Sequence, residues 1–526
     1  MQSEVSNSAQ MRVRGEPRPI RCQAAPKLVS FHPIRIFRVE DMTGITAYGA
    51  YIPRLRLQRK AIAQANAWFA PNLLGAAKGE RAMANFDEDA VTLAVEAGRA
   101  CVPANDPIKD RARIDAAYFA STSMPFSDRQ NAGIVASALS LSDDISSADV
   151  TSSMRAGTTA LIAGLDAVAS GRAKAPIVVA GEKRKARAAS TQELSFGDAG
   201  AAVTLGKDKV IAKLLGSHSR TLDFVDHFRG ESEEFDYAWE ERWIRDEGYT
   251  KIVPAVVKQL FEKTGISGGD VAHFILPCPF AKLDQQLAKA CGIDPAKVRD
   301  NLAGTVGDTG SAHAILMLAH ALETAKPGEK ILVAQFGQGC DALLFEVTPE
   351  IERLENRGNV SASLARRKEE TNYMKLLAFN GLIELEKGMR AEVDKRTALT
   401  VVYRKNDMLM GLVGGKCRVC GTAQFPRSRV CVGPNCKSVD SQDPYSFAEQ
   451  TGTVLSWSAD FLTYSMSPPN HYGMITFADG GRFMADITDV DQGQIDSGTK
   501  VKMSFRVKDR DERRGFVRYF WKAVPA

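Results

Sequence analysis

Four cysteines near the C-terminus constrain the fold of this chain more than any other feature of its sequence. They are spaced C-x2-C, ten residues, C-x4-C, and each pair lies beside glycine or proline, in KCRVCG and VCVGPNCK. This spacing is typical of a tetrahedral zinc site, although a disulfide pair or idle thiols would use the same residues. Because four protein thiolates leave no open position, the metal would stabilise a ribbon and catalyse nothing. The predicted ligands are Cys417, Cys420, Cys431 and Cys436.

The composition places the chain among globular proteins with more than one domain. Its 526 residues are 44% hydrophobic, and its net charge is only +5. This small charge predicts no nucleic-acid partner, and the lack of an apolar run near the roughly 20 residues of a membrane span predicts no membrane partner. The five remaining cysteines are scattered without paired spacing, which favours a reducing, cytoplasmic setting.

Most of the chain before residue 350 consists of an α/β unit that occurs twice. The first copy, within 86–182, reads helix, strand, helix, strand, and ends in PIVVAGE. The second copy follows at an offset of about 155 residues and ends in KILVAQFG. Strands that alternate with helices predict two α/β halves of parallel type, with a site where the halves meet. Positions in the two copies correspond to one another. Thr122 and Pro277 each follow a strand, and Met154 and Asp308 each precede a helix.

The remainder divides into smaller parts. Residues 1–41 show no apolar period and predict a flexible N-terminal extension. The charged stretch after Glu350 predicts a linker with a helical segment over 351–410. The zinc ribbon is expected at 411–440. Five short strand patterns over 441–526 predict a β-barrel of the OB type.

At this point two family resemblances stand out. Residues 42–350 resemble 3-hydroxy-3-methylglutaryl-CoA synthase, of the thiolase superfamily, in GITAYGAYIPRLRL, FDEDAVTLAVEA, RQNAGIVASALSL, SFGDAGAAVTLG and PFAKLDQQLAKACGI. Residues 411–526 resemble the DUF35 family, a rubredoxin-like zinc ribbon joined to an OB fold, in CRVCGTAQFPRSRVC and GGRFMADITDV. The resemblance implies a thiolase-like duplicated α-β-α-β-α domain fused to a ribbon and a barrel. It also implies a coenzyme A thioester as ligand, a homodimer, and a thiolase-like partner in an acyl-CoA-handling complex.

The family's catalytic positions are all changed in this chain. The resemblance places Met154 where the family has its nucleophilic cysteine, and a thioether cannot be acylated. Thr122 takes the place of the acid/base glutamate, Pro277 that of the histidine, and Asp308 that of the asparagine. Lys282, which the resemblance assigns to the CoA phosphates, is kept. This pattern predicts that CoA binding survives and that condensation does not.

Other residues could supply chemistry or binding in their place. Cys340 is a candidate nucleophile, with Cys278 as a weaker one, although both are more typical of a buried core. His313 could act as a base with Asp308, or be a satisfied helical histidine beside an N-capping aspartate. Lys183 and Arg184 could contact CoA phosphates, or belong to a solvated face.

Three functions therefore remain open from the sequence. The first is an acyl-CoA-binding subunit of a complex that forms or breaks C–C bonds, with or without catalysis of its own. The second is a stand-alone acyltransferase with a relocated nucleophile such as Cys340. The third is a structural interaction protein that binds no CoA.

Overall fold

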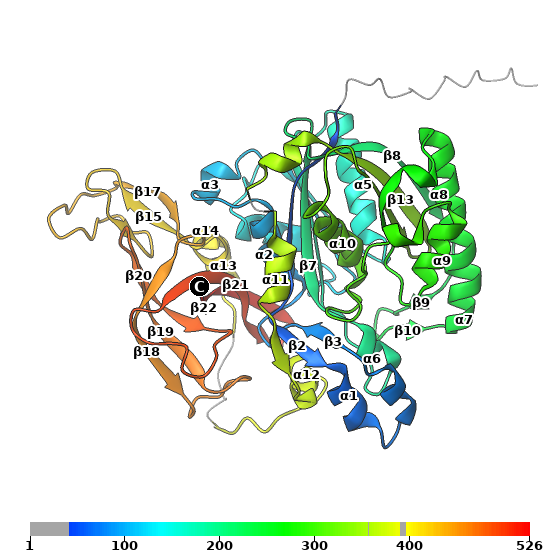
Figure 1. The fold of residues 1–526 in the computed structure, drawn as a ribbon. Helices are drawn as coiled ribbons and strands as arrows, with labels where there is room; N and C mark the ends of the chain where they lie inside the picture. Colours follow the sequence, from blue (N-terminus) through cyan, green and yellow to red (C-terminus); the bar gives the residue numbers. More distant parts are fainter. Residues whose placement is uncertain (1–41, 356, 390–395) are drawn as a thin grey trace, which may run out of the picture. The chain divides into compact units, whose positions relative to one another are not determined.

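The computed structural model describes residues 42–355, 357–389 and 396–526. The predicted extension over 1–41 lies outside the described residues. Residues from Met42 to Ala526 form one compact unit (Figure 1). No helix among the described residues is both long and apolar enough to cross a membrane.

A nine-stranded mixed sheet carries the duplicated domain. Its order is β11-β12-β13-β8-β1-β7-β6-β4-β5. The parallel pairs predicted from the sequence occur between β4, β5 and β6 and between β11 and β12, while the central strands pair antiparallel. The strands are β1 (Gly44–Tyr51), β4 (Ala116–Ala120), β5 (Ser146–Val150), β6 (Pro176–Glu182), β7 (Ala199–Gly206), β8 (Ala212–Thr221), β11 (Val271–Ile275), β12 (Lys330–Phe336) and β13 (Gly339–Val347).

Helices cover both faces of this sheet. Successive residues of β4 alternate between two cores, since Tyr118 packs with the central helices α5 (Ala156–Ala169) and α10 (His313–Leu322), and Phe119 packs with α2 (Ala90–Cys101) and α4 (Asn131–Ala138). On the other half, α8 (Thr250–Thr264) and α9 (Leu283–Ala290) pack on β12 and β13. The central helices α5 and α10 also share their core with Val333 of β12 and Leu343 of β13, so they lie between the two halves of the sheet, as the predicted α-β-α-β-α layering requires.

Part of the segment 351–410 packs on the duplicated domain. Its strand β14 (Lys368–Glu370) pairs with β2 (Leu55–Gln58), which in turn pairs with β3 (Glu80–Met83). The amphipathic stretch after Asn372 forms only the short helix α12 (Tyr373–Phe379) before residues 390–395, which are not described. The other short elements are α1 (Arg59–Asn66), α3 (Pro107–Asp110), α6 (Thr191–Ser195), β9 (His227–Phe228), β10 (Tyr237–Ala238), α7 (Glu241–Trp243), α11 (Asn359–Ala365), α13 (Leu399–Arg404) and α14 (Asn406–Met410).

The C-terminal part contains the predicted ribbon and barrel. The ribbon is built on β15 (Val413–Cys417), β16 (Ala423–Gln424) and β17 (Gln442–Ser446). The barrel closes in the order β18-β19-β20-β22-β21. Its strands are β18 (Gly452–Asp460), β19 (Asn470–Phe477), β20 (Arg482–Ile487), β21 (Lys500–Asp511) and β22 (Phe516–Pro525). The domain boundaries at 350, 410 and 440 stay predictions.

A buried set of charges joins the barrel to the start of α2. Arg506 on β21 contacts Glu88 Oε1 at 2.6 Å and Asp489 Oδ2 at 2.8 Å, and Lys522 on β22 contacts Asp87 Oδ2 at 2.9 Å. We call Arg506, Lys522, Asp87, Glu88 and Asp489 the junction cluster. Because both domains supply its members, separating them would leave buried charges unpaired.

Candidate functional site

Glu182, at the end of β6, gathers polar groups from both halves of the duplicated domain. Its side chain is completely buried. From the first half, Ser123 Oγ donates to Oε1 at 2.5 Å and the Thr122 amide donates to it at 3.1 Å. From the second half, Ser311 Oγ donates to Oε2 at 2.6 Å. A carboxylate therefore lies beside residue 122, although it comes from the neighbouring strand.

Arg184 occupies the space between Met154 and Asp308. Its Nη1 lies 3.6 Å from the Met154 sulfur, and its Nη2 lies 2.9 Å from Asp308 Oδ2. The guanidinium also covers the ring of Phe196, at 3.8 Å from the centroid. We call Glu182, Arg184 and Asp308 the central cluster. Arg184 is thus buried in the centre and does not face solvent, where a phosphate contact would need it.

Gly310 makes this close packing possible. It has a φ of +53°, and a Cβ atom there would come within 3.0 Å of both the Glu182 side chain and Arg184 Nε. Residues with a side chain are disfavoured on both counts. The turn after Asp308 therefore fits against the central cluster only because residue 310 is glycine.

The electrostatics of Asp308 are set mainly by its arginine partner. Burial on its own would raise the pKa of Asp308, but the Arg184 charge, His313 and a hydrogen bond from the Gly310 amide hold it at about 2. The Asp308 side chain is still 39% exposed. Asp308 is therefore an ionised, partly accessible carboxylate, which makes it a poor proton donor or acceptor near neutral pH.

His313 has both ring nitrogens engaged. Its Nδ1 accepts from the Thr309 amide at 2.9 Å, and its Nε2 contacts the Asn301 carbonyl at 2.8 Å. The ring must therefore carry its proton on Nε2, and burial lowers its pKa. The distance from Nδ1 to Asp308 Oδ1 is 3.8 Å. This geometry favours a satisfied structural histidine over a base.

The cysteine candidates are buried and have raised pKa values. Cys340, on β13, is 0% exposed, and burial raises the pKa of its thiol well above the usual range. Burial also raises the pKa of Cys278, to about 12. Because the thiolate is the nucleophile, both environments favour inert core thiols.

The remaining predicted site residues lie apart from the central cluster. Pro277 is buried after β11, and its carbonyl accepts from the Tyr249 hydroxyl at 3.3 Å. Lys282 is exposed at the N-cap of α9, in the left-handed region. Lys183 directs its ammonium at three backbone carbonyls, the nearest that of Glu88 at 2.9 Å. A phosphate would have to compete with these carbonyls for Lys183.

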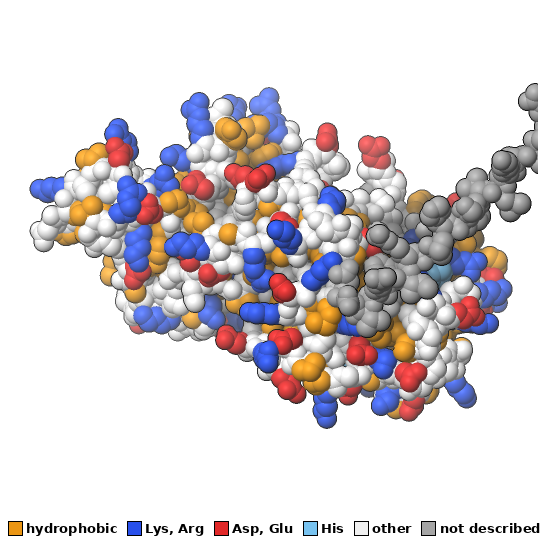
Figure 2. All heavy atoms as spheres, turned by 90° about the horizontal axis from the view of Figure 1, so that it is seen from above, with side chains coloured by type: hydrophobic (Ala, Val, Ile, Leu, Met, Phe, Trp, Pro, Cys, Tyr) orange, Lys and Arg blue, Asp and Glu red, His pale blue; other side chains and the backbone are white. Residues whose placement is uncertain are grey.

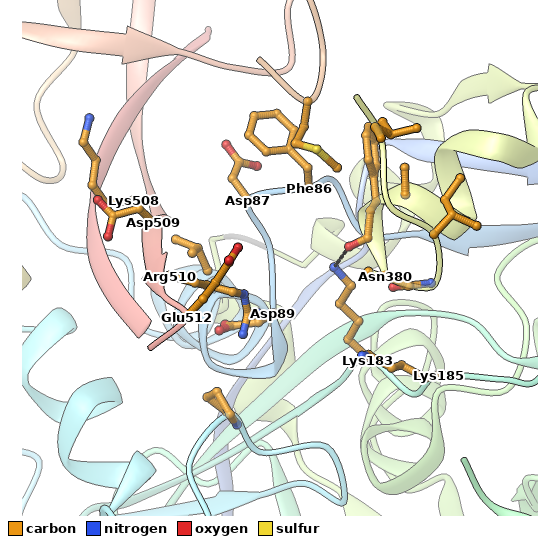
Figure 3. A pocket seen from close by; sticks show the side chains of 18 of the residues that line it. Phe86, Asp87, Asp89, Lys183, Lys185, Asn380, Lys508, Asp509, Arg510 and Glu512 are labelled. Carbon is orange, nitrogen blue, oxygen red and sulfur yellow. Dashed lines mark hydrogen bonds between the residues drawn. The ribbon is translucent and has the colours of Figure 1, made fainter. Parts of the chain in front are cut away.

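A cavity of about 940 Å³ opens beside the end of β4 (Figure 3). Thr122, Ser123 and Lys183 line it from the duplicated domain, and Lys508 and Arg510 line it from the barrel. The end of α12 and the loop 463–466 complete the wall. A second cavity of about 470 Å³ shares Lys185 and Arg229 with the first. Met154, Arg184 and Asp308 line neither of these two cavities.

The four ribbon cysteines form a compact sulfur cluster. Their ligand atoms lie within 4.8 Å of one another, with Sγ–Sγ distances of 3.8 Å between Cys417 and Cys436 and 3.5 Å between Cys420 and Cys431. Four thiolates about 2.3 Å from one zinc ion would be about 3.8 Å apart, so the donor set fits a metal ion.

Comparison with known proteins gives matches in both parts of the chain. Residues 261–346 match the C-terminal family of 3-oxoacyl-[acyl-carrier-protein] synthase III, and residues 445–506 match the C-terminal OB-fold domain of ChsH2. The hydroxymethylglutaryl-CoA synthase of Aeropyrum pernix is 31% identical over 343 residues, which cover 64% of this chain and 93% of that protein. The chain belongs to the hydroxymethylglutaryl-CoA synthase family. The synthase of Methanopyrus kandleri is 29% identical over 60% of this chain and 91% of its own length.

Solved structures agree on the fold of this family. A crystal structure of HMG-CoA synthase complexed with CoA aligns with a TM-score of 0.55 at 20% identity, over 68% of this chain and 95% of that one. The HMG synthase of the curacin biosynthetic pathway, in complex with apo donor-ACP, aligns with a TM-score of 0.55 at 17% identity over 66% and 92%. These results confirm the predicted thiolase-like domain, and the ChsH2 match confirms the OB fold.

Two members of the central cluster differ from what the sequence indicated. From the sequence, Glu182 is only the end of the strand PIVVAGE, and Arg184, in the basic run of residues 183–187, is predicted to contact CoA phosphates or to belong to a solvated face. A glutamate and an arginine two residues apart at the carboxyl end of a buried strand point to the same face, which could have marked them as inward-facing charges. The basic run is therefore not a solvated face at Arg184, because its guanidinium is needed to neutralise Asp308.

Proposed function

We propose that this chain is an acyl-CoA-binding member of the hydroxymethylglutaryl-CoA synthase family that does not itself perform the family's condensation. It would serve within a complex that forms or breaks C–C bonds. The position of Arg184, between Met154 and Asp308, carries this proposal. An arginine that neutralises Asp308 and contacts the residue at the nucleophile position occupies space that an acyl group and its catalytic base would need.

The substitutions and the geometry support the same conclusion. Met154 provides no thiolate, and Pro277 provides no imidazole. Glu182 lies beside residue 122, but its oxygens accept from Ser121, Ser123 and Ser311 and from backbone amides. A carboxylate so fully hydrogen-bonded is suited to holding the two halves together. A relocated nucleophile finds little support at Cys340, which is buried with a raised pKa.

The partner proposals rest on relatives. Solved structures with this fold include one complexed with CoA and one in complex with a donor carrier protein. CoA binding is the part of the family's function that this chain keeps, with Lys282 as the phosphate contact at the start of α9. We further propose a homodimer and a thiolase-like partner that performs the chemistry.

Two measurements on the purified protein test this function. After incubation with acetyl-CoA, intact-mass analysis should show no acetyl adduct in the wild type, because Met154 offers only a thioether and the buried thiols of Cys340 and Cys278 have raised pKa values. An adduct in the wild type would contradict the proposal, and one mapped to Cys340 or Cys278 would establish the relocated-thiol alternative.

Calorimetry with CoA tests the binding half of the proposal. Lys282→Ala should weaken binding by about 1.5–3 kcal/mol through the loss of a charge-assisted contact. Lys289→Ala, in the last turn of the same helix, is the matched control. If CoA binds neither to this chain alone nor in the presence of a thiolase-like partner, only the structural-interaction function remains.

We also propose that the ribbon cysteines hold one structural zinc ion. Bound zinc would fix the two cysteine pairs against each other, and with four protein ligands it would leave no position for a substrate. Metal analysis should give about one zinc per chain for the wild type and a loss of zinc for Cys420→Ser. Cys291→Ser, which removes a cysteine outside the cluster, is the control. A wild-type protein that is folded and metal-free would contradict this proposal.

A further inference from the structure

Arg510 is the one arginine lining the 940 Å³ cavity for which no carboxylate contact is found among the described residues, and of the lysines Lys387, which lies over the Tyr464 ring, also shows none. Lys508 contacts Asp486, Lys522 contacts Asp87, and Lys185 contacts Glu234. Arg229 contacts Asp236. Arg510 is exposed on β21, and among the described residues no hydrogen bond or ion pair is found for it, including with Glu512 two residues further on. Its guanidinium therefore has donors to offer to a ligand.

Lys183 supplies a second cation on the opposite wall. Figure 3 shows Arg510 approaching from the barrel and Lys183 from the end of β6. The Lys183 ammonium is held by carbonyls, with no carboxylate in contact among the residues described. Burial lowers its pKa, and the charge of Arg510 acts in the same direction. Positive potential from both domains thus acts on this end of the cavity.

Asp89, an acid that lines the same cavity, is already engaged by other groups. Both oxygens of Asp89 are used at the junction with the barrel, where Oδ2 accepts from the Tyr519 hydroxyl at 2.7 Å and Oδ1 accepts from the Thr92 amide at 3.0 Å. Part of the wall is apolar, with Phe86, Met124 and Phe379 among its residues. An apolar space with an unengaged guanidinium at one side suits an amphipathic ligand.

We propose that this cavity takes an acyl chain that ends in a carboxylate, and that Arg510 binds this carboxylate. The inference rests on the proposed CoA function, because the acyl chain would be presented as a thioester. A planar guanidinium binds a carboxylate through two parallel hydrogen bonds, which distinguishes it from a neutral chain end. The barrel would then determine which acyl group is accepted, a role separate from that of the central cluster.

A single carboxylate matches the cavity better than the phosphates of CoA. The wall carries seven acidic and seven basic residues, so its formal charge is balanced. Four of these basic residues already contact carboxylates, Lys183 is held by carbonyls and Lys387 lies over a ring, so among the described residues Arg510 is the one guanidinium here with no partner found. The phosphates of CoA carry several negative charges and would meet repulsion from the acidic residues. We therefore assign the phosphates to another surface.

The test compares glutaryl-CoA with valeryl-CoA, which has the same chain length without the terminal carboxylate. In the full-length protein, calorimetry should show tighter binding of glutaryl-CoA. Arg510→Ala should weaken glutaryl-CoA binding about tenfold to a hundredfold and leave valeryl-CoA unchanged. Arg510→Lys should retain only part of the preference, because an ammonium lacks the bidentate geometry. Lys502→Ala, an exposed residue on the same strand, is the matched control.

The outcomes separate the two levels of the proposal. Equal weakening of both ligands by Arg510→Ala would mean that Arg510 binds a CoA phosphate, which overturns the inference and keeps the CoA function. Equal affinity of the wild type for both ligands overturns it as well. If no CoA ester binds, the proposed CoA function is wrong, and calorimetry with free glutarate then tests the inference. Binding of glutarate that depends on Arg510 supports the inference, and no binding overturns it.

Discussion

The junction cluster and the central cluster both pair a buried arginine with carboxylates, but they differ in their access to solvent. In the junction cluster, the Arg506 side chain is 1% exposed, and its partners Glu88 and Asp489 are 2% and 11% exposed. In the central cluster, Arg184 is 3% exposed but Asp308 is 39% exposed. The first cluster is closed and joins two domains. The second keeps one carboxylate within reach of water.

This difference separates stability from function. Charges that are sealed from solvent, as those of Arg506 and Glu88 are, can only be satisfied or left unpaired, so this pair should respond to mutation and hardly to ligands. Within the central cluster, Arg184 rather than a substrate neutralises Asp308, and the Asp308 carboxylate remains near the surface. The centre of the duplicated domain is therefore filled by paired charges, while the cavity beside the barrel has room for a ligand.

The strongest test of the comparison is Arg506→Ala. Removing this arginine leaves the Glu88 and Asp489 carboxylates buried without their partner, and the expected loss of stability is about 3–5 kcal/mol. Chemical denaturation monitored by fluorescence measures it. Lys251→Ala, which removes the exposed partner of Glu247, should cost no more than about 1 kcal/mol. Similar losses of stability in both variants would contradict the distinction between the sealed cluster and a surface ion pair.

The sequence predicts the parts of this molecule that depend on periodicity and spacing. The helix at 90–101, the strand PIVVAGE and the five barrel strands follow from patterns of apolar residues, and the ribbon follows from cysteine spacing. The central strands β8 and β13 pair antiparallel, which helix–strand alternation does not reveal. Register and strand order depend on contacts between segments distant in the chain, so local patterns do not determine them.

The central cluster was harder to predict for a related reason. Arg184 meets Asp308, 124 residues further along the chain, and its burial depends on Gly310 leaving space. A basic run at the end of a strand is compatible with a solvated face as well as with an inward-facing arginine. The junction cluster could not be foreseen from either domain alone, because Arg506 and Glu88 become partners only when the barrel packs on α2.

Arg184→Ala should have a smaller effect than Arg506→Ala. Asp308 is partly exposed, so water can replace part of the interaction, and the expected loss is about 1–3 kcal/mol. The same denaturation experiment measures it, with Lys185→Ala, whose partner Glu234 is exposed, as the neighbouring control. A loss as large as that of Arg506→Ala would show that the central cluster is as closed as the junction, contrary to the measured exposure of Asp308.

The smallest expected effect is the pH dependence contributed by His313. Because its pKa is lowered in the folded state, the unfolded chain binds a proton more readily, and the stability contribution present above about pH 6.5 decreases as the pH falls toward the folded pKa. Each pH unit in this window changes the free energy of unfolding by at most about 1.4 kcal/mol. His313→Gln can still accept from the Thr309 amide, and it removes the titrating group. Unfolding measured between pH 7 and pH 5 should therefore show a shallower loss of stability in His313→Gln than in the wild type, with His471→Gln in the barrel as the matched control. An unchanged slope would mean that His313 titrates freely, as a solvent-accessible base beside Asp308 would, and the central cluster would then be open to proton transfer after all.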